Sequence, residues 1–166
     1  TCREHLGELD RITMDRRLIV LDEKVYSNAD LSQPLAPSDT VGKFLDFLER
    51  NRKEWGLARD VFIDCADQAT IMELKKWKRL HGSLYTFNDS YKKVEILDRI
   101  KFMLGWIQQG CYLVVDTCRE HLGELDRYSW QEDKDLPEDR NDHTINASQY
   151  GWIPYRGIIG FEEAQK

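Results

Sequence analysis

Three polar side chains close together in the sequence, Asp142, His143 and Asn146, have types and a spacing that suit a metal site. His143 and Asn146 are three residues apart, so they share one face if the segment is helical. Asp142 comes just before them and could cap the helix or add a carboxylate. Such a helix start can complete an oxygen-rich site for Mg²⁺ or Mn²⁺, in which two ions activate water and stabilise the leaving oxygen. From spacing alone, a capped helix with a surface histidine is the preferred interpretation.

A second candidate is Asp64, which ends the short apolar run at 61–63 in FIDCADQA. In open α/β sheets, functional groups gather at the carboxyl ends of strands. A carboxylate at that position can present its oxygens to a hard cation such as Mg²⁺ or Mn²⁺. Asp67 follows three residues later and could share the site. The alternative is that these aspartates cap a helix or anchor a loop.

Basic side chains are concentrated in the middle of the sequence. The chain has a formal net charge of −6, yet eight Lys or Arg stand against four acids over 71–101, whereas six acids stand against two basic residues over 132–142. Lys92 and Lys93 follow the segment FNDSY and are placed to meet phosphates at the start of a long helix. A basic middle and an acidic late loop suit an enzyme that binds phosphates and cations, but solvated surface explains the same pattern.

The hydrophobic pattern alternates strand-like and helix-like segments from Arg16 to Trp152. Such alternation predicts an α/β domain with helices packed on a central sheet. Strands are expected at 16–27, 61–63, 83–89 and 111–116, and helices at 38–56, 70–82, 90–110, 117–130 and 143–152. Ser38 is expected to cap the first of these helices and Gly82 to end the second.

The composition fits one soluble globular domain: 166 residues, 41% hydrophobic and 33% charged. No apolar run approaches the length of a membrane span, so no membrane partner is expected. The four cysteines lack CxxC or His-rich spacing, which favours reduced, buried thiols over a zinc site or a disulfide framework.

An eleven-residue segment, TCREHLGELDR, occurs twice without a difference, at 1–11 and at 117–127. The second copy fits a helix that follows a strand. The first copy has no such context, and the repeat stops where structural repeats would continue. An assignment or register artefact and a genuine short duplication are the two explanations, so residues 1–11 are given little weight.

The order of these segments resembles the nuclease domain of the large terminase subunit of tailed phages. The resemblance covers residues 18 to 152 and is most specific in the final third, CYLVVDTCREHLGELDRYSWQEDKDLPEDRNDHTINASQY. It implies an RNase H-like fold, with a central mixed β-sheet flanked by helices, and a two-metal Mg²⁺ or Mn²⁺ site that cuts concatemeric double-stranded DNA. It further implies the terminase ATPase domain, the small terminase subunit and the portal as partners, in the cytoplasm of the infected host cell. No phosphate-binding loop is present, so residues 1–166 are expected to be a single nuclease domain without the ATPase motor.

Matched to the family's motifs, Asp64 takes the place of the second metal-binding aspartate and His143 that of the histidine in the closing motif. Asn146 stands where the family has its last catalytic aspartate, which is a departure. The family's first metal-binding aspartate lies on an opening strand that residues 1–11 do not resemble. Asp10 is the nearest candidate, but only eight residues separate it from Ile19 in the next expected strand, so a strand and a turn are not expected there.

The leading hypothesis is therefore a metal-dependent endonuclease domain. Asp64 would hold a metal that activates water, and His143 would bind metal or shuttle a proton. Asp142 and Asn146 would complete the site, while Lys92 and Lys93 would position the DNA backbone. One rival is a non-catalytic RNase H-like module that binds DNA or a portal, favoured by Asn146 and by the missing first aspartate. Another is a resolvase or integrase core.

Overall fold

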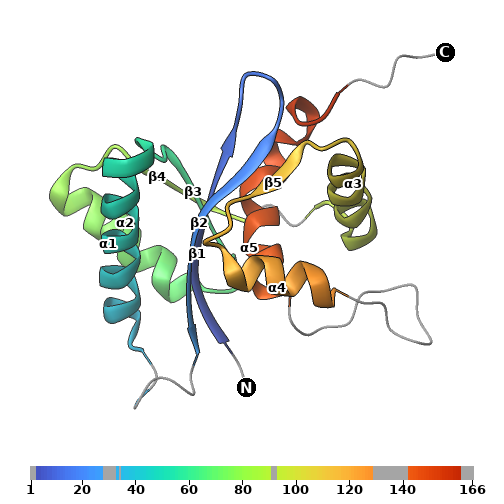
Figure 1. The fold of residues 1–166 in the computed structure, drawn as a ribbon. Coiled ribbons are helices and arrows are strands. Elements are labelled where there is room, and N and C mark those ends of the chain that lie inside the picture. Colours follow the sequence, from blue (N-terminus) through green and yellow to red (C-terminus); the bar gives the residue numbers. More distant parts are fainter. Residues whose placement is uncertain (1–2, 28–32, 34, 91–92, 129–141, 162–166) are drawn as a thin grey trace. The chain divides into compact units, whose positions relative to one another are not determined.

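Strands and helices alternate along the chain in the computed structural model, which describes residues 3–27, 33, 35–90, 93–128 and 142–161 (Figure 1). The elements are, in chain order, β1 (Arg3–Ile12), β2 (Leu18–Ser27), α1 (Pro37–Trp55), β3 (Asp60–Ile63), α2 (Gln68–His81), β4 (Thr86–Asp89), α3 (Ile96–Gln108), β5 (Tyr112–Val114), α4 (Arg119–Arg127), α5 (His143–Trp152) and the 3-10 helix η1 (Ile153–Ile158). The predicted α/β class is confirmed, and each helix and strand expected from Arg16 onward has a counterpart.

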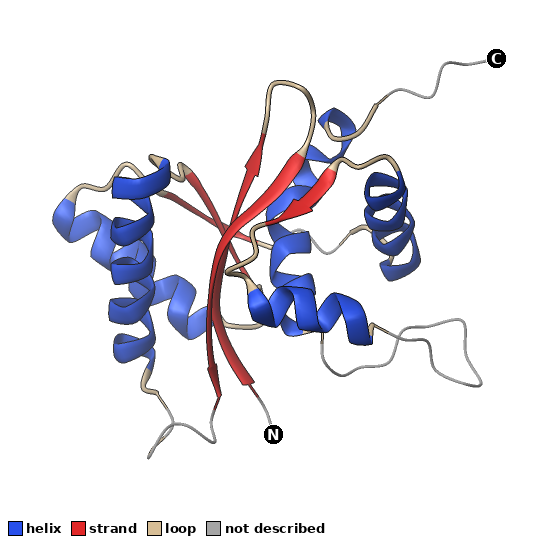
Figure 2. Ribbon diagram, viewed as in Figure 1, coloured by secondary structure: helices blue, strands red, loops and turns tan. Residues whose placement is uncertain are grey.

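The described strands form two sheets, one with the order β1-β2-β5 and one that pairs β3 with β4 (Figure 2). The chain divides into two compact units. Unit 1 comprises Thr1–Gly7 and Lys24–Tyr91, and unit 2 comprises Glu8–Glu23 and Lys92–Lys166. The sheet of β1, β2 and β5 is mixed, because β1 and β2 form a hairpin and β2 runs parallel to β5. The single nuclease domain over residues 1–166 stays a prediction.

In unit 1, β3 and β4 run parallel and in register from Asp60 opposite Thr86 to Ile63 opposite Asp89. Both strands therefore end at the same edge of the sheet. Helix α1 packs against α2, as Figure 1 shows. The short strands and the helices around them place Asp64, the residue after β3, at the edge where functional groups are expected.

The helix ends in unit 1 follow local chemistry. Helix α1 begins at Pro37, with Ala36 rather than the predicted Ser38 as its N-cap, because proline is pre-set for the first helical position. Asp67 caps α2 by accepting a hydrogen bond from the Thr70 amide at 3.1 Å. Gly82 ends α2 with a left-handed φ of 61°, as predicted.

In unit 2, β2 pairs with β5 from Leu18 opposite Tyr112 to Val20 opposite Val114. Alternate side chains of β2 face the core, and Leu18 and Val20 are both fully buried. Helices α4 and α5 pack against each other, and α3 packs against β5. The buried side chains of this core include Leu18, Met103, Trp106, Ile145, Trp152 and Ile153.

The hairpin of β1 and β2 corrects one expectation. Its turn needs only residues 13–17: the Thr13 amide donates to the Arg17 carbonyl at 2.9 Å, and the Arg16 amide donates to the Thr13 carbonyl at 3.0 Å. Arg16 adopts a left-handed φ of 64°, which lets the chain reverse. The expectation that too few residues separate Asp10 from Ile19 for a strand and a turn is therefore wrong.

The repeated segment takes two different structures. Residues 3–11 lie in β1, whereas the same nine letters at 119–127 form helix α4. In the strand, Leu9 is buried and, by alternation, Glu8 and Asp10 point to the opposite face. In the helix, His121 and Glu124 share one buried face at a spacing of three. Contacts elsewhere in the protein, not the local sequence, decide between the two.

Two smaller expectations are also tested. Among the described cysteines, Cys65, Cys111 and Cys118 carry free thiols, and the last two are buried as expected. None of the described helices has the combination of length and apolar character that crossing a lipid bilayer would require.

Candidate functional site

The start of α5 brings three of the predicted site residues into one helical turn. Asp142 is the N-cap residue and is only 6% exposed, and His143 is the first residue of the helix. The Asn146 side chain donates from Nδ2 to Asp142 Oδ2 at 2.9 Å, and the Asn146 amide donates to the Asp142 carbonyl at 2.8 Å. Asn146 thus presents an N–H, not its oxygen, to the neighbouring carboxylate.

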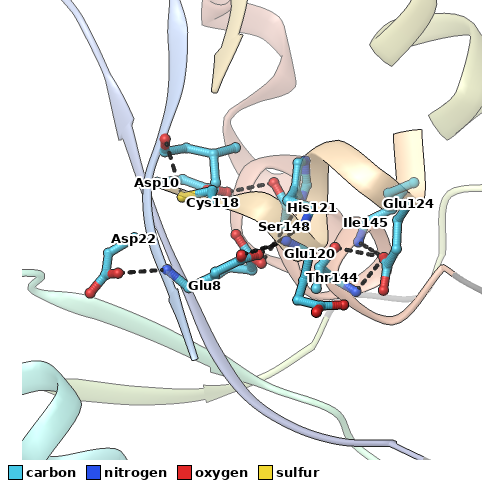
Figure 3. Close-up of polar contacts among 12 residues, drawn as sticks. Glu8, Asp10, Asp22, Cys118, Glu120, His121, Glu124, Thr144, Ile145 and Ser148 are labelled. Atoms are coloured by element: carbon cyan, nitrogen blue, oxygen red, sulfur yellow. Dashed lines mark hydrogen bonds and ion pairs between the residues drawn. The ribbon is translucent and has the colours of Figure 1, made fainter. Parts of the chain in front are cut away.

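The carboxylate that caps α5 comes from a different helix. Glu124 of α4 accepts three hydrogen bonds on Oε2, from the Thr144 amide at 2.8 Å, the Thr144 hydroxyl at 2.6 Å and the Ile145 amide at 3.1 Å (Figure 3). The first amides of a helix lack partners within the helix, and a negative charge there is further stabilised by the helix dipole. Glu124 therefore fixes where α5 begins and, with it, the position of His143.

Helix α4 is capped in the same way from strand β2. Glu23 accepts from the Glu120 amide at 2.8 Å and from the His121 amide at 2.9 Å, one bond on each carboxylate oxygen. Burial raises the pKa of Glu23, and these two hydrogen bonds oppose that rise. Two carboxylates in series therefore connect the sheet to the start of α5.

Beneath these caps lies a buried polar group built around His121. Its Nε2 is 2.8 Å from the Tyr112 hydroxyl and its Nδ1 is 3.7 Å from Glu8 Oε1. Burial lowers the pKa of His121 to about 4, so the ring is neutral near pH 7. Burial also raises the pKa of Glu8 well above its ordinary value, and the charge of Asp10 adds to the effect. Both shifts favour the uncharged form of the side chain, which is the form that costs less to bury.

Asp10 occupies the same face of β1 as Glu8. Its Oδ2 accepts a hydrogen bond from the Ser148 hydroxyl at 2.8 Å, across from α5 (Figure 3). Burial raises the pKa of Asp10 to about 7, and the hydrogen bond from Ser148 offsets part of the rise. The first copy of the repeated segment therefore supplies two acids to the interior of unit 2.

Asp64 lies in unit 1, directly after β3. Its Oδ1 accepts from the Ala66 amide at 2.9 Å and its carbonyl accepts from the Asp67 amide at 2.9 Å, so it shapes the turn that leads into α2. The adjacent Cys65 amide donates to the Ser90 hydroxyl at 3.1 Å, which joins the ends of β3 and β4. The side chain is half-buried. Its loop-anchoring contact is present, and its metal-binding role stays a prediction.

The two residues predicted to contact DNA, Lys92 and Lys93, come shortly before α3 in the sequence. Lys93 is exposed and precedes α3, whereas Lys92 lies outside the described residues.

The candidate metal ligands are divided between the two units. Asp64 belongs to unit 1, and Asp142, His143 and Asn146 belong to unit 2. Over the described parts of the chain, no three His, Cys, Asp or Glu side chains converge as a metal ion would require. The two-metal site and its Mg²⁺ or Mn²⁺ ions therefore stay a prediction.

The structure resembles that of a phage protein. No protein-family model matches the sequence, and no curated protein sequence matches it either. Its fold matches one part of the large terminase of a thermophilic bacteriophage. In one crystal form of that terminase, the match has a TM-score of 0.74 and 19% identity, and covers 92% of this chain and 36% of that one. In a complex of the same protein with ATP-γ-S, the TM-score is 0.71, with 19% identity and coverage of 87% and 35%.

These matches confirm the fold expected from the terminase resemblance. The chain spans about a third of the length of the phage terminase that it matches. At this level of identity the similarity concerns the fold, and the identity of the site residues rests on the sequence motifs. The comparison therefore shows the fold and assigns neither a role nor a reaction.

Sequence analysis missed the residues that hold the start of α5 in place. Glu124 and Glu23 are close to it only through tertiary structure, and no local spacing points to them. Glu8 and Asp10 were set aside with residues 1–11. The signal available was the pair of acids at 8 and 10, which falls on one face if the segment is a strand.

Proposed function

We propose that this chain is the nuclease part of a phage DNA-packaging terminase and cuts double-stranded DNA with Mg²⁺ or Mn²⁺ as cofactor. The observation that carries the proposal is the fold match to the large terminase of the thermophilic bacteriophage over 92% of the chain. Under this proposal the terminase ATPase domain, the small terminase subunit and the portal are its partners, in the cytoplasm of the infected host cell.

Within this proposal, Asp64 at the end of β3 and the α5 start with Asp142 and His143 are the candidate metal ligands. Asp142 is buried and next to His143, which sits on the first turn. The metal requirement rests on the terminase resemblance, because the described residues form no three-ligand group. Lys92 and Lys93 remain the candidates for positioning the DNA backbone.

A second function is favoured by one contact. Asn146 takes the place of a family aspartate and donates its amide N–H to Asp142 at 2.9 Å. An amide that turns a donor toward the neighbouring carboxylate leaves fewer oxygens for a cation than an aspartate would. This arrangement favours a non-catalytic module that binds DNA or a portal protein.

Plasmid nicking by the purified chain tests the first function. We expect cleavage with Mn²⁺ or Mg²⁺, none with EDTA, and loss of cleavage in Asp64→Ala. Asp46→Ala is the matched control, since Asp46 is an exposed acid on α1 of the same unit. Cleavage that persists in Asp64→Ala would remove that residue from the mechanism.

Asn146→Asp separates the two functions with a second readout. The substitution puts a second carboxylate next to Asp142, 2.9 Å away in the present structure, so repulsion should lower the melting temperature in EDTA. If the site binds metal, Mn²⁺ should restore the melting temperature and raise nicking above that of the unchanged chain. Asn146→Ala removes the hydrogen bond without adding charge and is the control. No Mn²⁺ response and no nicking in any variant would favour the binding module.

A further inference from the structure

Unit 2 carries an open groove beside the first turns of α3. It has a volume of about 550 Å³ and is lined by Lys93, Glu95, Asp98, Lys101, Phe102 and Arg156. Sites for small molecules usually have volumes of about 300–1,000 Å³. Lys93, which is predicted to contact DNA, is one of the lining side chains. None of the candidate metal ligands lines the groove. Apart from Lys93, the lining side chains therefore have no part in the proposed cleavage site.

The apolar wall of the groove is a supported aromatic ring. Phe102 is 37% exposed, and its ring stacks on Trp106 at a centroid distance of 5.7 Å and an angle of 29°. Trp106 in turn meets the buried Trp152 edge-on at 4.8 Å. Because Trp106 is held in the core, Phe102 has a fixed support and can act as a stacking platform for a flat ring.

The cationic side chains around Phe102 come from three different places in the chain. Lys93 precedes α3, Lys101 lies within it and Arg156 lies in η1. Arg156 Nη1 donates to the Ile153 carbonyl at 2.8 Å, which fixes a guanidinium that has further donors for a phosphate. Lys101 is 77% exposed and its 3.7 Å contact with Asp98 is solvated, so this ion pair is weak and leaves the ammonium available.

The acids in the groove make a bare anion a poor match. Glu95 and Asp98 lie among the three cations, so the groove has both hydrogen-bond acceptors and positive charge beside one aromatic ring. A nucleotide carries the complementary groups: a flat base with N–H donors and a phosphate. A paired base has its Watson–Crick donors occupied and its face stacked. Only an unpaired nucleotide can therefore contact the acids, the cations and the aromatic ring of the groove together.

We propose that this groove binds one unpaired nucleotide, with its base on Phe102 and its phosphate among Lys93, Lys101 and Arg156. The nucleotide can be free or part of an unpaired DNA strand. The second source rests on the proposed function, in which the chain handles DNA.

Fluorescence anisotropy of a labelled oligothymidine, with the full chain in EDTA, tests this proposal without cleavage. Phe102→Ala should weaken binding about tenfold, the effect of losing one base–aromatic contact, and Phe102→Tyr should restore it. Phe161→Ala is the matched control, because Phe161 is a 53% exposed aromatic of the same unit outside the groove. Equal effects of Phe102→Ala and Phe161→Ala would overturn the proposal, as would an equal loss of binding to a duplex of the same sequence.

A charge variant tests the phosphate side and stays informative if Phe102→Ala folds poorly. Lys101→Glu should weaken binding and flatten its salt dependence by about one phosphate contact. Lys76→Glu is its control, since Lys76 makes the same kind of exposed i, i+3 ion pair, with Glu73 at 3.9 Å. Equal responses of the two lysine variants would refute the placement of the phosphate.

Two further arms distinguish the sources and the two proposals. Competition by thymidine monophosphate would indicate a free nucleotide, whereas displacement by unlabelled oligothymidine alone would indicate a strand. Nicking without Phe102-dependent binding refutes the groove and leaves the nuclease function standing. Phe102-dependent binding without nicking supports the groove and counts against the nuclease function.

Discussion

The same substitution at the same position of the two repeated segments should have different effects on stability. Glu8 and Glu124 are equivalent letters of the repeat, but one lies in β1 and the other in α4. Glu124→Gln replaces a carboxylate that accepts three hydrogen bonds at the start of α5. Glu8→Gln replaces a carboxyl whose pKa burial raises well above its ordinary value.

The expected changes in unfolding free energy follow from the hydrogen bonds and the charge of each carboxyl group. A hydrogen bond to a charged group contributes about 1.5–3 kcal/mol and a neutral one about 1 kcal/mol, so loss of the charge at Glu124 should cost about 2 kcal/mol. A helix-dipole contribution of roughly 0.5 kcal/mol is lost with it. Glu124→Ala should cost about 4 kcal/mol, because it leaves the two amides and a hydroxyl buried without their acceptor. Glutamine has nearly the shape of a protonated glutamate but takes up no proton on folding. Because burial raises the folded pKa of Glu8, the unchanged chain loses stability as pH rises above the ordinary pKa of a glutamate, so Glu8→Gln should not lower stability near pH 7 and should raise it relative to the unchanged chain.

Urea unfolding followed by tryptophan fluorescence would measure both effects, because Trp106 and Trp152 lie in the core of unit 2. Asp126→Ala is the control for helix α4, since Asp126 is an exposed acid on it. A loss of stability in Glu8→Gln as large as that in Glu124→Gln would refute the argument, which holds that burial disfavours the charge of Glu8 in β1 whereas the charge of Glu124 caps α5.

Two further predictions concern unit 2. Asp10 has a folded pKa of about 7 against an ordinary 3.8, so its contribution to stability is complete below about pH 4 and is lost as pH rises to 7, an effect of about 4 kcal/mol. Asp10→Asn keeps an acceptor for the Ser148 hydroxyl, so its stability relative to the unchanged chain should rise by that amount between pH 4 and pH 7, measured by urea unfolding at each pH; a constant difference would contradict the buried acid. Gly160→Ala should be more destabilising than Gly110→Ala, because both glycines have left-handed φ values, 83° and 68°, but only at Gly160 would the added Cβ meet a ring, 2.8 Å from Trp106. The φ strain alone should cost about 1 kcal/mol and the contact about 1–3 kcal/mol more, visible as thermal unfolding midpoints, and equal midpoints would contradict a rigid ring at this contact.

Most elements followed from local signals that the sequence carries. Gly82 ended α2 where its left-handed conformation was expected, and the polar segment at 142–146 proved to be a helix start. These features depend on residues within a few positions of one another. The N-cap of α1 was misplaced by two residues, because Pro37 at the first turn outweighed the side-chain capping capacity of Ser38.

Strand β1 could not be predicted because its letters also form a helix. At 119–127 the segment gains its cap from Glu23 and a histidine partner in Tyr112. At 3–11 the same letters pair with β2, and Leu9 takes the buried side. Tertiary contacts therefore outweigh local propensity over nine residues. The cap from Glu124 escaped prediction for the same reason, since its partner Thr144 is 20 residues away.

The two caps in series have a consequence for how the protein opens. Glu23 holds the start of α4, and Glu124 of α4 holds the start of α5, so α5 loses its cap whenever α4 unravels. The amides of both helices should then exchange with deuterium as one cooperative unit, at the rate set by release of α4 from β2. A peptide cut from within the repeated segment has the same mass whether it comes from β1 or from α4, so its deuterium uptake cannot be assigned to α4 by mass. Deuterium uptake of α5 peptides would therefore be the measure of this coupled opening.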